Sequence, residues 1–599
     1  MAFDFVNSVH KMEQLKLVGI FCAGVIFTSC SMPKTNVDLV MSNGDFCTLD
    51  QRMPEAEAVA VNDGQIVGVG TDREISSRFV AKDSVDLGGA FVLPGLIDGH
   101  GHMSELGSSL TTLDLRDARS PEEIADLVRK AAIKSSKGEW IRGRGWNQDL
   151  WRDKALPGHG VLDKAAPDNY VLLVRIDGHA IWVNDRVMQF AGITRATGEP
   201  SGGRIARDKD GNPSGVFLDA AKELITSKIP PPTDAEIESA ILLAADTCIR
   251  YGLTEVHDAG IDAQTLRVYK KLADEGKLKM RIYAMYLGTD STLPAILKQG
   301  PLIDYKKILT MRSVKVYMDG ALGSRGAALV QSYTDDPGNY GLTEMSETDL
   351  ENLTIASLSN GFQVCTHAIG DRGNHIVLNA YEAALRVAEV PDPRLRIEHA
   401  QVLLEEDIPR FKKLGVIPSM QPTHCTSDMS WVEMRLGPQR IKSAYVWQSL
   451  LKDGNIIIGG SDFPVESPDP RLEIYAAVTR RDLFGLPRNF QDVKKYFEVT
   501  RDISKDSSDF DGGFFPQERM TTEQALQAFT VWPAFGAFQE NEKGSVSIGK
   551  YADFTVFKRD IRKIAPTEIP EDEILGTIFA GELVYSSPSW MTIPAQARR

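Results

Sequence analysis

The sequence predicts an α/β protein whose centre is a (β/α)8 barrel, a ring of eight parallel strands surrounded by helices. Through the middle of the chain, apolar strand-like runs alternate with amphipathic helical stretches, which is the pattern of βα units around a parallel sheet. Short strands separated by turn residues occupy both chain ends, at residues 36–90 and 540–590. These two ends are expected to form one small β-sandwich domain beside the barrel of residues 91–539.

Eight apolar runs are candidates for the barrel strands. They are residues 91–98, 253–258, 281–287, 313–318, 362–367, 395–399, 416–421 and 455–462. An ordinary barrel takes about 250 residues, and this span is longer, with the surplus between the first and second runs. Residues 103–250 therefore predict an α+β lobe that is inserted after the first barrel strand and covers the active site.

The β-rich segment near the N-terminus contains a hairpin signal. Two alternating apolar runs, 57–61 and 65–69, are separated by Asn-Asp-Gly, and an Asp-Gly pair at this position favours a tight turn. Strand-like runs at 549–557 and 577–585 follow the barrel, so the chain is expected to return to the same domain.

Composition excludes one class of partner. The chain has 599 residues and a formal net charge of −15, whereas a nucleic-acid surface needs a basic face. We therefore expect no nucleic-acid partner. The six cysteines include no Cys-x-x-Cys pair, which argues against a zinc ribbon or a disulfide framework. The oligomeric state does not follow from the sequence.

Residues 1–30 have the features of a bacterial lipoprotein signal peptide. The apolar run 17–27 follows two lysines and ends shortly before Cys30; it is short for a transmembrane helix but suits the apolar centre of a signal peptide. Cys30 would then carry a lipid that anchors the protein in the membrane of the cell envelope. The true start is Met1 or Met12. The alternative is a buried N-terminal helix in a cytoplasmic protein.

Five metal-binding side chains lie at the ends of predicted barrel strands. The first strand ends Asp-Gly-His100-Gly-His102, and side chains two residues apart on a strand point the same way. His367, His399 and Asp462 end three later runs, at the face where barrel enzymes keep their active sites. Together these residues predict a centre for a divalent cation.

Longer motifs surround these residues. They are 94–102 (PGLIDGHGH), 177–184 (DGHAIWVN), 314–327 (VKVYMDGALGSRGA), 366–374 (THAIGDRGN), 396–401 (RIEHAQ), 421–428 (QPTHCTSD) and 460–465 (GSDFPV). In these motifs, and over nearly the whole chain after the leader, the sequence resembles the amidohydrolase superfamily. Within it, the sequence looks like the amidohydrolase family 3, or YtcJ-like, group, which includes N-substituted formamide deformylase.

The resemblance implies one or two metal ions, with zinc as the expected metal. The implied ligands are His100, His102, Lys315 and Asp462 for a buried ion and, with Lys315 shared, His367 and His399 for a more exposed ion. Lysine can bridge two metals about 3.5–4 Å apart once carbon dioxide has converted it to a carbamate. The alternative for Lys315 is a solvated side chain or a pair with Asp319.

The resemblance also implies hydrolysis of an amide-like, non-peptide C–N bond in a small organic substrate. Zinc lowers the pKa of a bound water to about 7 and polarises a carbonyl group. Asp462 would accept the proton of that water and pass it to the leaving nitrogen. The further candidates are His179, to polarise the carbonyl, and Trp182, Arg325, Gln421 and His424, to contact the substrate. A loop role for His179 and a core role for Trp182 are the alternatives.

Two other classes of function fit the same residues. A surface lipoprotein could bind a small ligand or a metal without converting it, although such a protein has no need of a general base such as Asp462. A lyase or isomerase could use the same metal barrel. Release of an amine or an acid distinguishes hydrolysis from both.

If Cys30 carries a lipid, Cys30→Ala should release the protein from the membrane fraction or leave the leader uncleaved, because the acyl chains supply the membrane affinity. Cell fractionation and mass spectrometry of the N-terminus measure these outcomes. A cytosolic protein with an intact N-terminus would contradict the expectation.

Overall fold

The computed structural model describes residues 33–115, 118–148, 151–175, 180–200, 203–429, 431–482 and 513–591. The expected signal peptide, its lipid site Cys30 and the catalytic candidate His179 lie outside these ranges. Within them, no helix is both long enough and apolar enough to cross a membrane.

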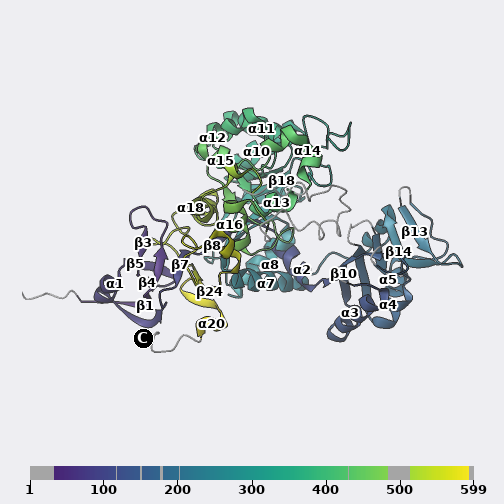
Figure 1. Cartoon of the computed structure of the whole chain (residues 1–599), viewed down its shortest axis with the longest axis horizontal. Coiled ribbons are helices and arrows are strands. Elements are labelled where there is room, and N and C mark those ends of the chain that lie inside the picture. The colour runs from purple at the N-terminus through teal and green to yellow at the C-terminus, as the bar shows by residue number, and fades with distance from the viewer. Residues whose placement is uncertain are drawn as a thin grey trace, which may run out of the picture.

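A nearly closed barrel of eight parallel strands forms the centre of the molecule (Figure 1). In sheet order its strands are β22 (Ile458–Gly459), β21 (Ile417–Met420), β20 (Arg396–His399), β19 (Gln363–Ala368), β18 (Leu309–Tyr317), β16 (Arg281–Leu287), β15 (Leu253–Ile261) and β8 (Leu96–Gly101). The short β17 (Leu302–Tyr305) pairs antiparallel with β18. The predicted barrel fold is confirmed.

The barrel closes between its last and first strands, β22 and β8. Their backbones approach so closely that a Cβ atom added to Gly99 would lie 2.7 Å from the carbonyl oxygen of Gly459, so this position needs glycine. Just beyond, the amide of Asp462 donates to the carbonyl of His100 over 2.7 Å. Closure therefore brings the first and the last predicted metal ligands together.

Helices cover the outside of the barrel. They are α2 (Met103–Thr111), α7 (Asp234–Arg250), α8 (Ala263–Asp274), α9 (Leu293–Gln299), α10 (Glu347–Ser359), α11 (Asp371–Ala388), α12 (Ile408–Leu414), α15 (Trp447–Lys452), α16 (Pro470–Thr479), α18 (Thr522–Ala528) and α19 (Val531–Gly536). Helix α7 begins with a capping box between Thr233 and Glu236. Its apolar face packs against α2, and both helices contribute to the main core.

The inserted lobe has its own sheet and its own hydrophobic cores. Its strands, in sheet order, are β13 (Gly203–Arg207), β14 (Pro213–Asp219), β12 (Ala180–Val183), β11 (Tyr170–Arg175), β10 (Trp140–Trp146) and β9 (Leu113–Asp114). Helices α3 (Pro121–Lys134), α4 (Gly160–Ala165) and α5 (Asp185–Ala191) pack with this sheet. In Figure 1 the lobe lies to the right of the barrel, beyond α2. It is narrower than the expected residues 103–250, because α2 and α7 belong to the barrel.

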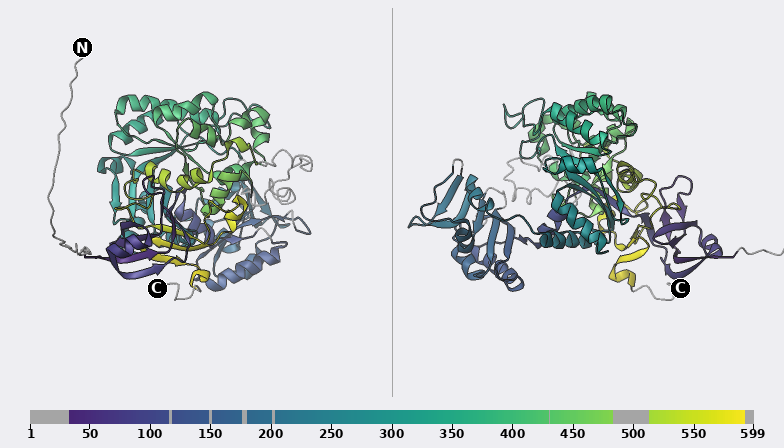
Figure 2. Two further views of the ribbon diagram at one scale, coloured as in Figure 1. Left: turned by 60° about the vertical axis from the view of Figure 1, so that its left-hand side comes forward. Right: turned by 180° about the vertical axis from the view of Figure 1, so that it is seen from behind.

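Two further sheets lie beside the barrel: the first contains N-terminal strands only, and the second combines strands from both chain ends. Figure 2 shows the purple and yellow strands side by side. One sheet holds β5 (Gln65–Gly70), β4 (Ala58–Asn62), β1 (Thr35–Ser42) and β6 (Phe79–Asp86); the other holds β25 (Glu582–Ser586), β24 (Ile574–Phe579), β23 (Phe554–Phe557), β7 (Phe91–Pro94), β2 (Asp45–Cys47) and β3 (Glu55–Ala56). One core spans both ends, with the rings of Phe46 and Phe554 5.9 Å apart.

Strand β7 differs from the sequence-based expectation, which placed residues 91–98 in one barrel strand. Phe91–Pro94 pairs antiparallel with β23 outside the barrel, and only the residues after Gly95 enter β8. Both segments are fully buried, so a continuous apolar run does not reveal that the chain changes sheets at Gly95.

Candidate metal centre

The six predicted ligands come from five barrel strands and meet at one end of the barrel. They are His100 on β8, His102 just after it, Lys315 on β18, His367 on β19, His399 on β20 and Asp462 after β22. The ring of His399 lies 5.0 Å from that of His100 and 4.5 Å from that of His367. Parallel strands bring their carboxyl ends to one face, where loops complete the site.

Three of these side chains form a compact group around one carboxylate oxygen. Asp462 Oδ1 lies 3.1 Å from His102 Nε2 and 3.6 Å from His100 Nε2. Lys315 Nζ lies 3.2 Å from the same nitrogen of His100. Asp319, the alternative partner for this lysine, instead accepts hydrogen bonds from three backbone amides.

A second group shares Asp462 and contains His424, a residue that the motifs suggested as a substrate contact. His424 lies on α13 (Pro422–Asp428), with Nε2 3.7 Å from Asp462 Oδ2. Its ring is stacked with that of His399 at 5.9 Å. The ligand atoms of His399, His424 and Asp462 all lie within 4.8 Å of one another. The two oxygens of Asp462 therefore face two different sets of imidazoles.

His367, expected with His399 at the more exposed ion, has His399 and Asp319 as neighbours in the structure. Its ring contacts His399, but its Nε2 lies 3.8 Å from Asp319. Among the described residues, it belongs to no group of three His, Cys, Asp or Glu side chains at metal-binding separation. The geometry thus adds His424 to the candidate ligands, and the role of His367 beside His399 stays a prediction.

Burial keeps most of these imidazoles in the neutral form that can bind a metal. Burial, helped by the charge of Lys315, lowers the pKa of His100 to about 4. Burial also lowers the pKa values of His367 and His399 well below the usual range. Burial alone would raise the pKa of Asp462, but the hydrogen bond with His102, whose own pKa Asp462 raises, holds the Asp462 pKa well below its usual value.

Two buried side chains orient candidate ligand imidazoles through hydrogen bonds with their Nδ1 atoms. Gln421 Oε1 accepts a hydrogen bond from Nδ1 of His399 over 2.7 Å, and Glu398 Oε2 accepts one from Nδ1 of His100 over 2.5 Å. Each bond leaves the other ring nitrogen with its lone pair free for a metal. Gln421, expected as a substrate contact, is only 3% exposed and is hydrogen-bonded to the candidate metal ligand His399.

Trp182 and Arg325, both expected as substrate contacts, have different surroundings in the structure. Trp182 is fully buried in the core of the inserted lobe, where its ring lies 6.0 Å from Trp146 and 6.3 Å from Trp151. Arg325 pairs with Asp335 at 2.9 Å. The indole of Trp182 is therefore enclosed by its own lobe, whereas Arg325 is partly exposed and its contact with a substrate stays a prediction.

Arg396 supports the site but was not identified from the sequence. It is fully buried and lies 2.7 Å from the carboxylate of Glu398. Both residues are on β20, two positions apart, so their side chains point to the same face. An Arg-x-Glu pair in an otherwise apolar strand is the signal that could have identified it.

A cavity of about 500 Å³ opens beside His102. It is lined by α2, by the start of α7 and by the loop after β15, and its lining includes Glu105, Glu236 and Asp262. Its volume lies in the range of small-molecule sites, about 300–1,000 Å³. The cavity is therefore large enough to hold a small molecule next to His102, against a partly acidic lining.

The donor atoms fit a zinc-class ion. Imidazole nitrogens and a carboxylate oxygen are common zinc ligands, and catalytic sites keep one position open for water or substrate. The Nε2 atoms of His367 and His424 are buried without a hydrogen-bond partner. Buried polar atoms of this kind are rare in folded proteins and call for an ion or a water as partner.

Known proteins share this architecture. The amidohydrolase family model matches residues 83–585. Protein LONG AFTER FAR-RED 3 of Arabidopsis thaliana is 32% identical over 568 residues, which cover 92% of this chain and 91% of that protein. N-substituted formamide deformylase of Arthrobacter pascens is 26% identical over 569 residues, which cover 92% of this chain and 98% of that protein.

A solved structure agrees with these sequence matches. An uncharacterized metal-dependent hydrolase from Pyrococcus horikoshii OT3 aligns with a TM-score of 0.70 and 25% identity, over 88% of this chain and 99% of that chain. The family match covers the barrel strands, the inserted lobe and, in the β domain, β7 and the strands from the C-terminal part of the chain. The chain belongs to the amidohydrolase family of metal-dependent hydrolases.

Proposed function

We propose that the protein cleaves an amide-like, non-peptide C–N bond of a small organic substrate by attack of water. The observation that carries this proposal is the position of Asp462, an ionised carboxylate in contact with both sets of imidazoles. The name of the relative N-substituted formamide deformylase supports the bond class.

A bound zinc-class ion would acidify a water molecule and polarise the substrate carbonyl. Asp462 is placed to accept the proton of the attacking water, because its carboxylate stays ionised beside His102. The resulting carboxyl group can then donate that proton to the leaving nitrogen, which departs more readily as a neutral amine. One residue thus serves as base and then as acid.

We propose the cavity beside His102 as the path for the substrate. Its lining carries the carboxylates of Glu105, Glu236 and Asp262. Like charges repel across a cleft with low-dielectric walls. The cavity therefore favours neutral or positively charged amides over anionic ones.

A substrate screen tests the proposed reaction. Zinc- or manganese-loaded protein is incubated with N-acyl, N-formyl and cyclic amides, and the released amine and acid are identified by mass spectrometry. Turnover should be lost after chelation and should return when metal is added. Full activity in protein that contains no transition metal would contradict the proposal.

Asp462→Asn should lower turnover by at least about 100-fold, because the amide cannot take up the proton that a general base removes. Much of the metal should remain bound, since His100 and His102 are intact. Steady-state kinetics and elemental analysis measure the two effects. Asp371→Asn, a change in another buried carboxylate, serves as the control. Near-native turnover of Asp462→Asn would place the base elsewhere.

Lys315→Ala should lose activity and part of the bound metal. Burial lowers the pKa of Lys315, which favours the neutral amine that reacts with carbon dioxide to form a carbamate. Acetate or propionate in excess should then restore part of both properties by supplying a carboxylate in its place. The same acids added to the unaltered protein are the control. A variant that keeps two metals and full turnover would exclude the bridging role.

His424→Gln should weaken metal binding at the group formed with His399 and Asp462, since one nitrogen ligand is lost. Elemental analysis after dialysis against a weak chelator measures this. His159→Gln, a change in the inserted lobe, should leave the metal content unchanged. If His424→Gln keeps its full metal content and only raises KM, His424 is a substrate contact instead.

A further inference from the structure

A line of buried polar side chains crosses the interior of the barrel from its floor to the metal centre. Its members are Lys543, Glu255, His257, Arg396, Glu398 and His100, and none is more than 6% exposed. Barrel interiors are usually filled by layers of bulky branched apolar side chains. This interior departs from that rule along one continuous path.

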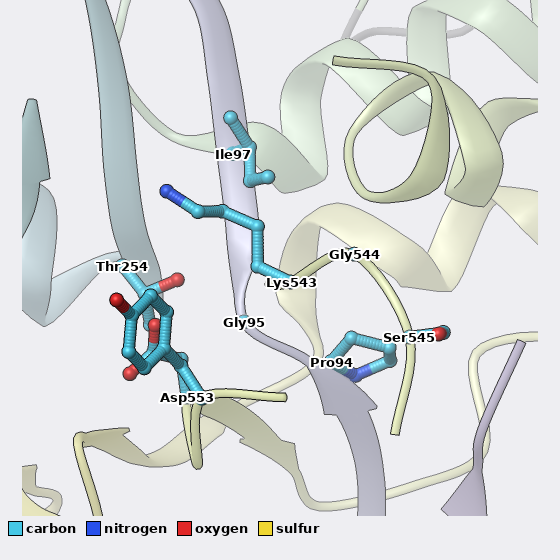
Figure 3. Close-up of a pocket in the computed structure, with 9 residues that line it drawn as sticks. Pro94, Gly95, Ile97, Thr254, Lys543, Gly544, Ser545 and Asp553 are labelled. Carbon is cyan, nitrogen blue, oxygen red and sulfur yellow. The ribbon is translucent and has the colours of Figure 1, made fainter. Parts of the chain in front are cut away.

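The line begins at the floor with an ion pair between Lys543 and Glu255. Figure 3 shows Lys543 at this floor, with its amine directed between the strands that carry Ile97 and Thr254. The other carboxylate oxygen of Glu255 lies 3.3 Å from His257 Nε2. The first three members are therefore in direct contact.

The line continues across the barrel to β20 and β8. Arg396 Nη1 donates to His257 Nδ1 over 3.0 Å, and its Nε and Nη2 lie 2.7 and 3.0 Å from the carboxylate oxygens of Glu398. Glu398 in turn accepts the hydrogen bond from His100 Nδ1. Because Nδ1 of His257 accepts from Arg396, the neutral ring of His257 carries its proton on Nε2. Because Nδ1 of His100 donates to Glu398, the neutral ring of His100 carries its proton on Nδ1.

Arg396 also holds the backbone next to the ligand. Its Nη2 donates to the carbonyl oxygen of Gly99 over 2.8 Å and to Ser419 Oγ over 2.9 Å. The same guanidinium thus fixes the partner of the His100 ring and the residue that precedes His100 in the chain. Buried ion pairs contribute little net stability, because both charges must be desolvated. Stability alone does not account for this arrangement.

We propose that Arg396 and Glu398 are positioning residues for the metal ligand His100. The line of buried polar side chains that ends at Lys543 holds them in place. In this arrangement the Nδ1 proton of His100 is bound to Glu398, and the Nε2 lone pair points to the centre. The adjacent carboxylate makes this nitrogen a better donor to a metal. The inference rests on the metal centre of the proposed hydrolase and does not depend on the identity of its substrate.

Metal affinity tests the proposal without a substrate. Glu398→Gln removes the charge beside His100, and its affinity for zinc, measured by competition with a chelator, should fall by about 10- to 100-fold. The visible absorption bands of the cobalt-substituted protein should shift as well, because the field of one ligand has changed. A side chain that only supports the fold would alter neither property in the folded protein.

Two further variants separate positioning from stability. Asp553→Asn disrupts the buried pair of Asp553 with Arg281 at the floor, which touches no ligand; it should lower the unfolding temperature but leave zinc affinity and cobalt bands unchanged. Glu398→Gln leaves the charge of Arg396 unpaired, so the double variant Arg396→Gln with Glu398→Gln is measured in parallel. It should also bind zinc more weakly, and it decides the test if the single variant does not fold.

Native zinc affinity and native cobalt bands in a folded Glu398→Gln or double variant would overturn the inference. Failure of the unaltered protein to bind zinc or cobalt would instead refute the metal-dependent reaction proposed above. A protein that binds metal as expected but hydrolyses no amide would leave the role of Arg396 and Glu398 standing. The experiments thus distinguish a failure of the proposed hydrolysis from a failure of the positioning role of Arg396 and Glu398.

Discussion

Closure of the barrel between β8 and β22 is the constraint on which the rest of the centre depends. The hydrogen bond from the Asp462 amide to the His100 carbonyl joins segments at opposite ends of the barrel sequence. It sets the Asp462 carboxylate beside the imidazoles of His100 and His102. Gly99 permits this closure, since any side chain there would meet the backbone of β22.

Once closed, the barrel buries several ionisable groups in one place, and their charges must balance. Burial favours neutral imidazoles at His100 and His399, and the hydrogen bond with His102 keeps Asp462 ionised. Below the centre, Arg396 and Glu398 compensate each other, as do Lys543 and Glu255. A charge removed from either pair leaves its partner uncompensated in a medium of low dielectric constant, which is strongly destabilising.

The two faces of the barrel have separate tasks. At the carboxyl ends of the strands lie the ligands and the cavity beside His102. At the other end, the β domain made from both chain ends is attached through buried contacts such as the pair of Arg281 with Asp553 at 2.7 Å. Lys543 belongs to this attachment and also to the line of buried polar side chains that leads to His100. The floor of the barrel is therefore connected to the metal centre through side chains rather than through the backbone alone.

The sequence by itself determined the barrel and placed the His-x-His pair at the end of a barrel strand, because strand alternation and this pair are local patterns that directly reflect backbone geometry. Only the tertiary structure decided which groups these side chains join. His424 reaches the centre from a helix, Trp182 is enclosed in the lobe, and residues 91–98 divide between two sheets. A local pattern shows which face of an element is apolar or reactive. The neighbour that this face meets is set by packing between segments that are distant in the sequence.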